Sequence, residues 1–201
     1  MKRKITVVAL ILLCLTIIGS GSLAYFTAEA QAHNVITTNG IDIQIVEKML
    51  DENGDLVDFP PEGVHVGMPG TSVSKIVTVK NVGGDTAWIR VKIDETAVAQ
   101  DGTALSNVIG ENLIMQYTVD AENWIANRGW YYYTKPVAPG GSTTELFSQV
   151  HFAEWMGNEY EDSTMNLIVY AQAVQTANNG DTVQDAQGWP DKLKADQEGE
   201  E

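Results

Sequence analysis

The chain has 201 residues and a formal net charge of −15 at pH 7, with 27 acidic and 12 basic side chains. A chain of this length is typical of one domain with terminal extensions. A strongly acidic surface repels nucleic acid and anionic membranes, so we expect neither as a partner of the mature protein.

The first 24 residues have the layout of an export signal. Basic residues at positions 2–4 precede an apolar run from Ile5 to Ile18, which is too short to span a bilayer comfortably. Ser22 and Ala24 place small residues at the −3 and −1 positions that a signal peptidase reads. The sequence therefore predicts secretion, with a cut between Ala24 and Tyr25 and no membrane association afterwards.

Two other N-terminal arrangements stay open. Ala30 and Ala32 also follow the small-x-small rule for cleavage, and an uncleaved membrane anchor is the third alternative. The only cysteine, Cys14, lies inside the signal. The mature chain therefore has no disulfide and no catalytic thiol, and its stability must come from a packed core, subunit contacts or a bound ion.

The chain after the signal begins with a strand pattern. Ile41, Ile43 and Ile45 lie on one face because strand side chains alternate with period 2, and Asn39-Gly40 indicates a bend or bulge. A two-residue hairpin turn is then predicted at Asn53-Gly54. The oxygens of Asp51, Asn53, Asp55 and Asp58 have a spacing that could hold calcium. The pattern lacks the closing glutamate of an EF-hand, so we expect no cofactor and keep calcium as the alternative.

The following segments are expected to be mostly short strands. We predict a hairpin from strands at 71–81 and 86–93 joined by a turn at 82–85, with Ile89 and Val91 on its apolar face and Trp88 on its solvated face. A short helix or a long crossover is expected at 94–110. Further strands are predicted at 113–120, 124–127, 130–135, 143–152 and 165–177. The last of these is nearly continuous in apolar residues, which predicts a place near the centre of a sheet.

The end of the chain is expected to be irregular. Residues 182–189 predict one or two helical turns that stop at Pro190. Residues 191–201 form a charged, acidic tail that we expect to be disordered. The predicted divisions are a signal at 1–24, a leader at 25–36, a β domain at 37–190 and this tail.

Many short strands separated by turns and little helix predict an all-β chain. We expect a two-sheet β-sandwich of jelly-roll type, with an immunoglobulin-like arrangement as the alternative and only short helical segments.

A search for catalytic chemistry predicts none. His33, His65 and His151 are far apart, and His151 with Glu154 lacks the second histidine that a zinc protease motif requires. No G-x-S-x-G elbow or glycine-rich phosphate loop is present. The aromatic segment Trp130–Tyr133 could bind a glycan or a protein partner, or it could pack into the sheet with alternate side chains in the core.

Three segments carry a family resemblance. They are SLAYFTAEAQAHNVITTNGIDIQIVE at 22–47, GWYYYTKPVAPGGSTTELF at 129–147 and VYAQAVQTANNGDTVQDAQGWP at 169–190. In content, order and spacing they resemble the TasA/camelysin family of Gram-positive bacteria, and in particular the SipW-dependent biofilm matrix proteins of the BsaA type. The resemblance implies a jelly roll, export through a SipW-type signal peptidase, and a structural role in extracellular fibres of the biofilm matrix or cell surface.

The resemblance also implies a mode of assembly. In TasA-like fibres the freed N-terminal segment becomes a strand of the next subunit, and here that donor would be Tyr25–Val35. The putative assembly strand begins at Tyr25 and its best anchors are Phe26 and Val35, although residues 25–33 are alanine-rich and weakly β-forming. The alternative is a leader that packs on its own domain.

The partners implied are other copies of the chain, the peptidase during export, and an accessory matrix protein. A camelysin-like surface metalloprotease and a monomeric glycan-binding protein are the rival functions.

Overall fold

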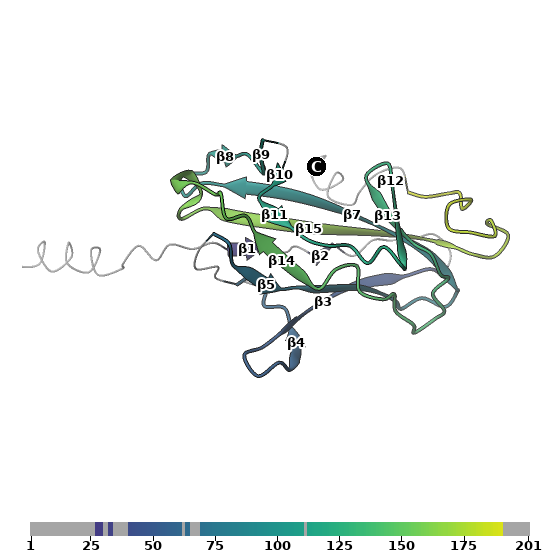
Figure 1. The fold of residues 1–201 in the computed structure, drawn as a ribbon. Coiled ribbons are helices and arrows are strands. Elements are labelled where there is room, and N and C mark those ends of the chain that lie inside the picture. Colours follow the sequence, from purple (N-terminus) through teal and green to yellow (C-terminus); the bar gives the residue numbers. More distant parts are fainter. Residues whose placement is uncertain are drawn as a thin grey trace, which may run out of the picture.

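The computed structural model describes residues 27–29, 32–33, 40–61, 63–64, 69–110 and 112–190. They form fifteen β-strands and one short 3-10 helix, η1 (Asn158–Tyr160) (Figure 1). The predicted all-β class is therefore confirmed, and the strands are arranged as two facing layers. Within the described residues, no helix is long and apolar enough to cross a membrane.

The first layer is a sheet built on two long strands. β7 (Ala87–Val98) and β15 (Thr164–Gln175) pair in antiparallel fashion along their whole length. Beyond β7 lie β13 (Trp130–Tyr133), β12 (Trp124–Asn127) and the short β8 (Ala104–Leu105). On the other side, β15 pairs with β1 (Thr27–Glu29) and β2 (Ala32–His33).

The second layer joins two three-stranded sheets. One has the order β4 (Leu56–Asp58), β3 (Ile43–Leu50), β6 (Ile76–Asn81), and the other β11 (Met115–Gln116), β14 (Gln149–Phe152), β5 (Ser72–Ser74). Between them, the Leu146 amide donates to the Val77 carbonyl at 2.8 Å, and the Val77 amide donates to the Phe147 carbonyl at 3.2 Å. Hydrogen bonding therefore continues from one sheet to the other. A separate hairpin joins β9 (Val108–Ile109) to β10 (Asn112–Leu113).

The core lies between the inner faces of the two layers. At the start of β15, for example, Met165, Leu167 and Val169 are buried while the residues between them are partly exposed, as the period of 2 predicts. One continuous cluster contains Ile43, Ile45, Val77, Val79, Ile89, Val91, Leu167 and Val169. Burying one such side chain contributes about 1.5–3 kcal/mol, so this cluster is the main source of stability in a fold without disulfides.

The predicted hairpin at 71–93 is wrong, because its two strands belong to different layers. β6 pairs with β3, whereas β7 pairs with β15 and β13. The buried Asn81 fixes the corner between the layers, since its Nδ2 donates to the carbonyls of Asp85 and Val137 at 2.8 and 2.9 Å. A Cβ on Gly83 would lie 2.4 Å from the backbone nitrogen of Asp42, so the chain can turn this tightly only with glycine there.

Three other local expectations are corrected. Residues 94–110 contain no helix, because β7 continues to Val98 and strands β8 and β9 follow. The Asn53-Gly54 turn is part of a five-residue connection from Leu50 to Leu56, closed by an Asp51 N–H to Asp55 carbonyl bond of 2.9 Å. Residues 182–189 make turns without helix. The jelly-roll order of strands stays a prediction.

Candidate assembly site at the edge of β15

The N-terminal strands lie against one edge of β15. Both pair with it in parallel, with Thr27 opposite Thr164 in β1 and Ala32 opposite Val169 in β2. The offset between partners is the same in both strands, so they follow one register. Strands β1 and β2 thus extend the first layer beyond β15 (Figure 1).

β15 is well suited to accept such a strand. Its inner face carries Met165, Leu167 and Val169, each at most 1% exposed, and β7 pairs with its other edge throughout. A long apolar strand with an open edge is a template for another strand. β2 also lies beside β3 of the second layer, so the N-terminal segment lies where the two layers meet.

The pairing is moderate in strength. β1 contributes three register positions and β2 contributes two. A backbone hydrogen bond contributes about 0.5–1.5 kcal/mol net, so the segment adds a few kcal/mol to the fold. A strand held by this amount can leave one edge and take an equivalent edge without unfolding the core.

The structure places only part of the predicted assembly segment. The cleavage pair Ala24 and Tyr25, the anchors Phe26 and Val35, and the divisions 1–24 and 191–201 lie outside the described residues. Residues Thr27–Glu29 and Ala32–His33 pair with β15 of their own chain. Donation of the same residues to a neighbouring subunit stays a prediction.

The aromatic strand β13 divides its side chains between two faces. Tyr133 is buried in the main core, and Tyr131 packs against that core. Trp130 and Tyr132 face outward, where the guanidinium of Arg90 lies 4.1 Å from the Trp130 ring centroid. Half of the segment Trp130–Tyr133 therefore packs inside the sheet. The other half lies on the outer face, where it contacts a cation rather than open solvent.

A C-terminal strap, residues 178–189, covers part of this outer face. Val183 and Ala186 pack against Trp88 and Val174 in a second apolar cluster. Trp88 was expected on the solvated face and is only 5% exposed. The strap therefore corrects that expectation, which could not account for a contact between residues so distant along the chain.

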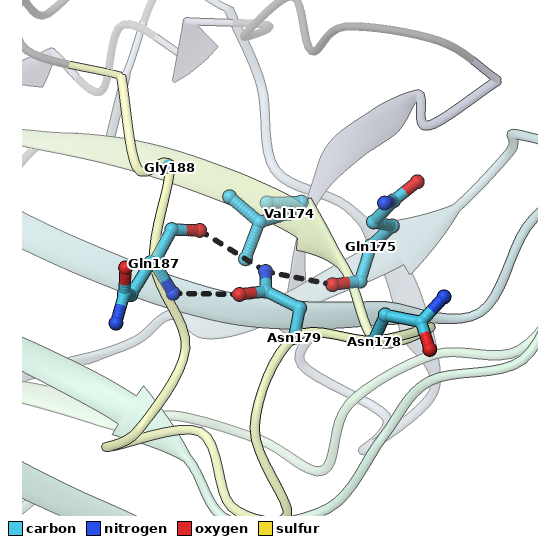
Figure 2. A pocket seen from close by; sticks show the side chains of 7 residues that line it. Val174, Gln175, Asn178, Asn179, Gln187 and Gly188 are labelled. Carbon is cyan, nitrogen blue, oxygen red and sulfur yellow. Dashed lines mark hydrogen bonds between the residues drawn. The ribbon is translucent and has the colours of Figure 1, made fainter.

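The strap is held at its base by Asn179 (Figure 2). Its Nδ2 donates to the carbonyls of Gln175 and Gln187 at 2.9 and 3.0 Å, and its Oδ1 accepts the Gln187 amide at 2.8 Å. Beside it is a shallow cavity of about 340 Å³ lined only by uncharged residues. Both N–H groups and the oxygen of the Asn179 side chain form hydrogen bonds within the fold, which assigns this residue a structural role.

The residues considered as metal ligands form hydrogen bonds within the fold or lie outside the described residues. His151 Nδ1 lies 3.0 Å from Ser72 Oγ, and His65 lies outside the described residues. Asp51 Oδ1 accepts the amides of Asn53 and Asp55 at 2.8 and 2.9 Å. Among the described residues, no group of three or more His, Cys, Asp or Glu side chains gathers as metal ligands do.

One buried ion pair lies at the edge of the core. Lys75 Nζ is 2.9 Å from Glu47 Oε1 and 3.9 Å from the Phe59 ring centroid, and the Lys75 side chain is 2% exposed. Burial lowers the pKa of Lys75, and the charge of Glu47 opposes that shift. A pair enclosed in this way contributes structure rather than an open binding site.

Comparison with known proteins adds no relative. No family model matches the chain, and no curated protein and no solved structure is similar to it. The functional argument therefore depends on the residues themselves, and above all on the edge of β15.

Proposed function

We propose that this chain is a secreted structural subunit of extracellular fibres in a biofilm matrix or at a cell surface. The observation that carries the proposal is the parallel pairing of β1 and β2 with β15. This pairing supports the N-terminal segment as the donor and the edge of β15 as its acceptor. In the fibre, the donor of one subunit takes the same register on β15 of the next.

The exchange needs little free energy. A donor paired with its own β15 and a donor paired with a neighbour's β15 make the same backbone hydrogen bonds. The equilibrium is then set by concentration and by the new contacts between subunits, as in domain swapping. Because the contact is head-to-tail and does not close, it yields a filament rather than a ring.

The resemblance to the TasA/camelysin family supports the same function. Within that proposal, a SipW-type signal peptidase releases the N-terminus, and only the released segment reaches another subunit. Cleavage is then the event that starts assembly outside the cell. We propose no enzymatic activity, and an accessory matrix protein that offers a first edge is the further partner.

Engineered cysteines test the donor and its acceptor directly. The chain after residue 24 contains no cysteine, and Thr27 lies opposite Thr164. We would make T27C and T164C as separate variants, mix them under assembly conditions and oxidise the mixture. A disulfide between the two variants can form only between chains, so strand donation predicts this heterodimer in the pelleted filaments.

The double variant T27C/T164C is the matched control. It reports pairing within one chain as a monomer that migrates faster without reductant. Monomeric cross-links in the double variant, together with no heterodimer in the mixture, would show that the leader stays on its own domain.

A further inference from the structure

A gap beside β7 carries a second site, which does not depend on strand donation. On one edge of β7, β13 pairs with Arg90 and Val91, and β8 pairs with Ala97 and Val98. Between these positions, no described strand pairs with that edge. The gap leads into a cavity of about 470 Å³ with Ile93, Leu113 and Tyr117 among its lining residues.

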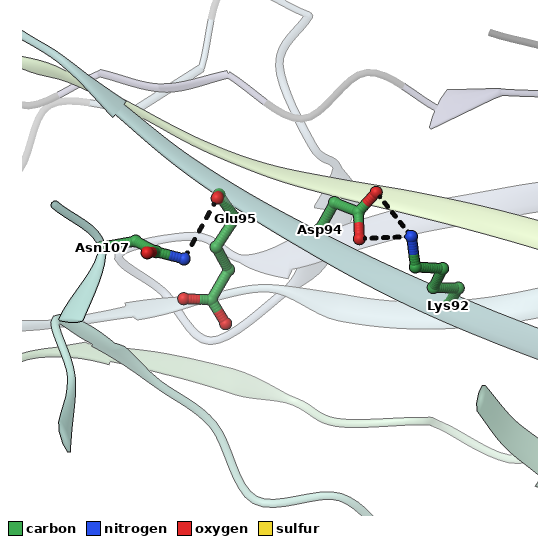
Figure 3. A network of polar contacts seen from close by, with 4 residues as sticks. All are labelled: Lys92, Asp94, Glu95 and Asn107. Carbon is green, nitrogen blue, oxygen red and sulfur yellow. Dashed lines mark hydrogen bonds and ion pairs between the residues drawn. The ribbon is translucent and has the colours of Figure 1, made fainter. Parts of the chain in front are cut away.

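The cavity contains the side chain of Glu95. Figure 3 shows its carboxylate directed away from the neighbouring Lys92–Asp94 pair, while Asn107 donates from Nδ2 to the Glu95 backbone carbonyl at 3.2 Å. The Tyr117 hydroxyl is a hydrogen-bond partner of the carboxyl group. Oxygen Oε2 of Glu95 is buried and has no hydrogen-bond partner among the described residues.

Among the residues that the structure describes, no basic side chain forms an ion pair with Glu95. Lys92, the basic residue drawn beside it, has its Nζ 2.8 and 3.0 Å from the two carboxylate oxygens of Asp94. Burial accordingly raises the pKa of Glu95 from 4.5 to about 7, against a smaller lowering by Tyr117. A buried carboxylate without a positive partner costs free energy whenever it ionises, so the cavity attracts a positive group.

We propose that this cavity binds a lysine or arginine side chain presented by an extended segment of a partner protein. The ammonium or guanidinium group pairs with Glu95, and the methylene stem lies along Ile93 and Leu113, as long basic side chains often do. Asp94 at the rim and the net charge of −15 draw a basic segment toward the gap.

The lining favours a basic side chain over a metal ion. Calcium takes 6–8 oxygen ligands, and among the described residues the carboxylates that line the cavity are those of Asp94 and Glu95. The Asp94 carboxylate is already paired with Lys92. A single ammonium group, by contrast, needs one carboxylate and a few additional acceptors.

The binding should depend on pH. The groups that face Glu95 are the hydroxyl of Tyr117, with Tyr131 beside it, and the paired Asp94 and Lys92 at the rim. Glu95 is mostly neutral at pH 5.5 and mostly ionised at pH 8, since its pKa is about 7. Binding of a cation should therefore be stronger at pH 8.

Peptide titration followed by NMR tests the site. The probe is a blocked alanine–lysine–alanine tripeptide, added to the complete chain at pH 8 while amide signals are recorded. We expect saturable shifts at Glu95, Asn107 and Tyr117. The same peptide with norleucine, which keeps the stem and removes the charge, should cause no saturable shift.

Two variants separate a specific site from general attraction. Glu95→Gln should weaken binding by about tenfold or more, the equivalent of 1.4 kcal/mol, whereas the exposed Glu122→Gln makes the same change in net charge and should leave binding unchanged. A thermal melt of each variant checks folding. Equal binding by both variants, shifts that never saturate, or equal affinity at pH 5.5 and pH 8 would each overturn the proposal.

Discussion

The sandwich has two incomplete edges, and they differ in what they lack. The outer edge of β15 is not covered by β7, and the short strands β1 and β2 pair with it. In the gap along β7, Glu95 Oε2 is buried and has no hydrogen-bond partner among the described residues, and no described basic side chain pairs with Glu95. We expect the edge of β15 to bind a strand through backbone and apolar contacts, and the gap along β7 to bind a charged side chain.

Because of this difference, the two edges should select different kinds of partner. A strand on β15 gains register from backbone hydrogen bonds along several residues, so its partner must be extended and long. The cavity beside β7 gains specificity from one charge. Its short edge between β13 and β8 offers little room for strand pairing, in keeping with how proteins limit unwanted edge contacts.

The largest expected effect comes from a buried carboxylate that already has its cation. Lys75→Met leaves the Glu47 carboxylate without the basic side chain that pairs with it, and no described basic side chain pairs with Glu95 either. Removing one member of a buried pair costs about 3–5 kcal/mol, so the melting temperature should fall by about 10 °C. The double variant Glu47→Leu/Lys75→Met should recover most of the loss, and no recovery would mean that packing, not charge, decides the effect.

Proline in the N-terminal strand should break the first edge. Successive amides of a strand point to opposite sides, so A28P/E29P removes a hydrogen-bond donor toward β15 whichever residue supplies it. We expect loss of filaments and a monomer destabilised by a few kcal/mol. The matched control A28S/E29Q should assemble normally, and filaments formed by the proline variant would remove Thr27–Glu29 from the assembly strand.

Glu95→Gln, at the gap along β7, should change how the stability of the protein depends on pH. The pKa of Glu95 is about 7 in the fold and 4.5 ordinarily, so its neutral form stabilises the protein fully below pH 4.5. That stability is lost as the pH rises to 7. At pH 8 the free energy of unfolding of Glu95→Gln should exceed that of the wild type by on the order of 1–2 kcal/mol. This value is reduced because the Glu95 carboxyl is partly exposed.

Urea unfolding of wild type and Glu95→Gln at pH 5 and pH 8 measures this difference. Glu122→Gln again supplies the control for net charge. An equal stability difference at the two pH values would contradict the role assigned to burial of Glu95.

The smallest effect concerns a face outside both edges. Trp130→Ala removes one of the rings next to Arg90, which also lies 4.6 Å from the Trp189 ring centroid. Cation–π contacts contribute about 0.5–1 kcal/mol, so unfolding should become easier by roughly that amount while filaments still form. Loss of filaments in this variant would show that the outer face takes part in assembly.

The sequence predicted what depends on local pattern. Alternation identified Ile89 and Val91 as core residues, and Arg128-Gly129 produced the expected hairpin because both residues take positive φ angles, 50° and 78°. The fold class and most of the strands were therefore accessible from the sequence.

Long-range features could not be predicted in the same way. The amino-acid sequence of the turn at 82–85 does not show whether the turn joins neighbouring strands of one sheet or crosses between layers. The burial of Glu95 depends on Tyr117 and on residues 104–113, which are distant in sequence. The leader was recognised as a candidate strand, but its register with β15 required the structure.

Electron microscopy of two N-terminal forms tests the central claim most directly. We would purify the chain beginning at Tyr25 and the chain beginning at Thr37, and image both by negative stain at matched concentration, with and without calcium. Strand donation predicts filaments from the first form and single particles from the second. Filaments from the form beginning at Thr37, or single particles from both forms, would contradict assembly through the N-terminal strand.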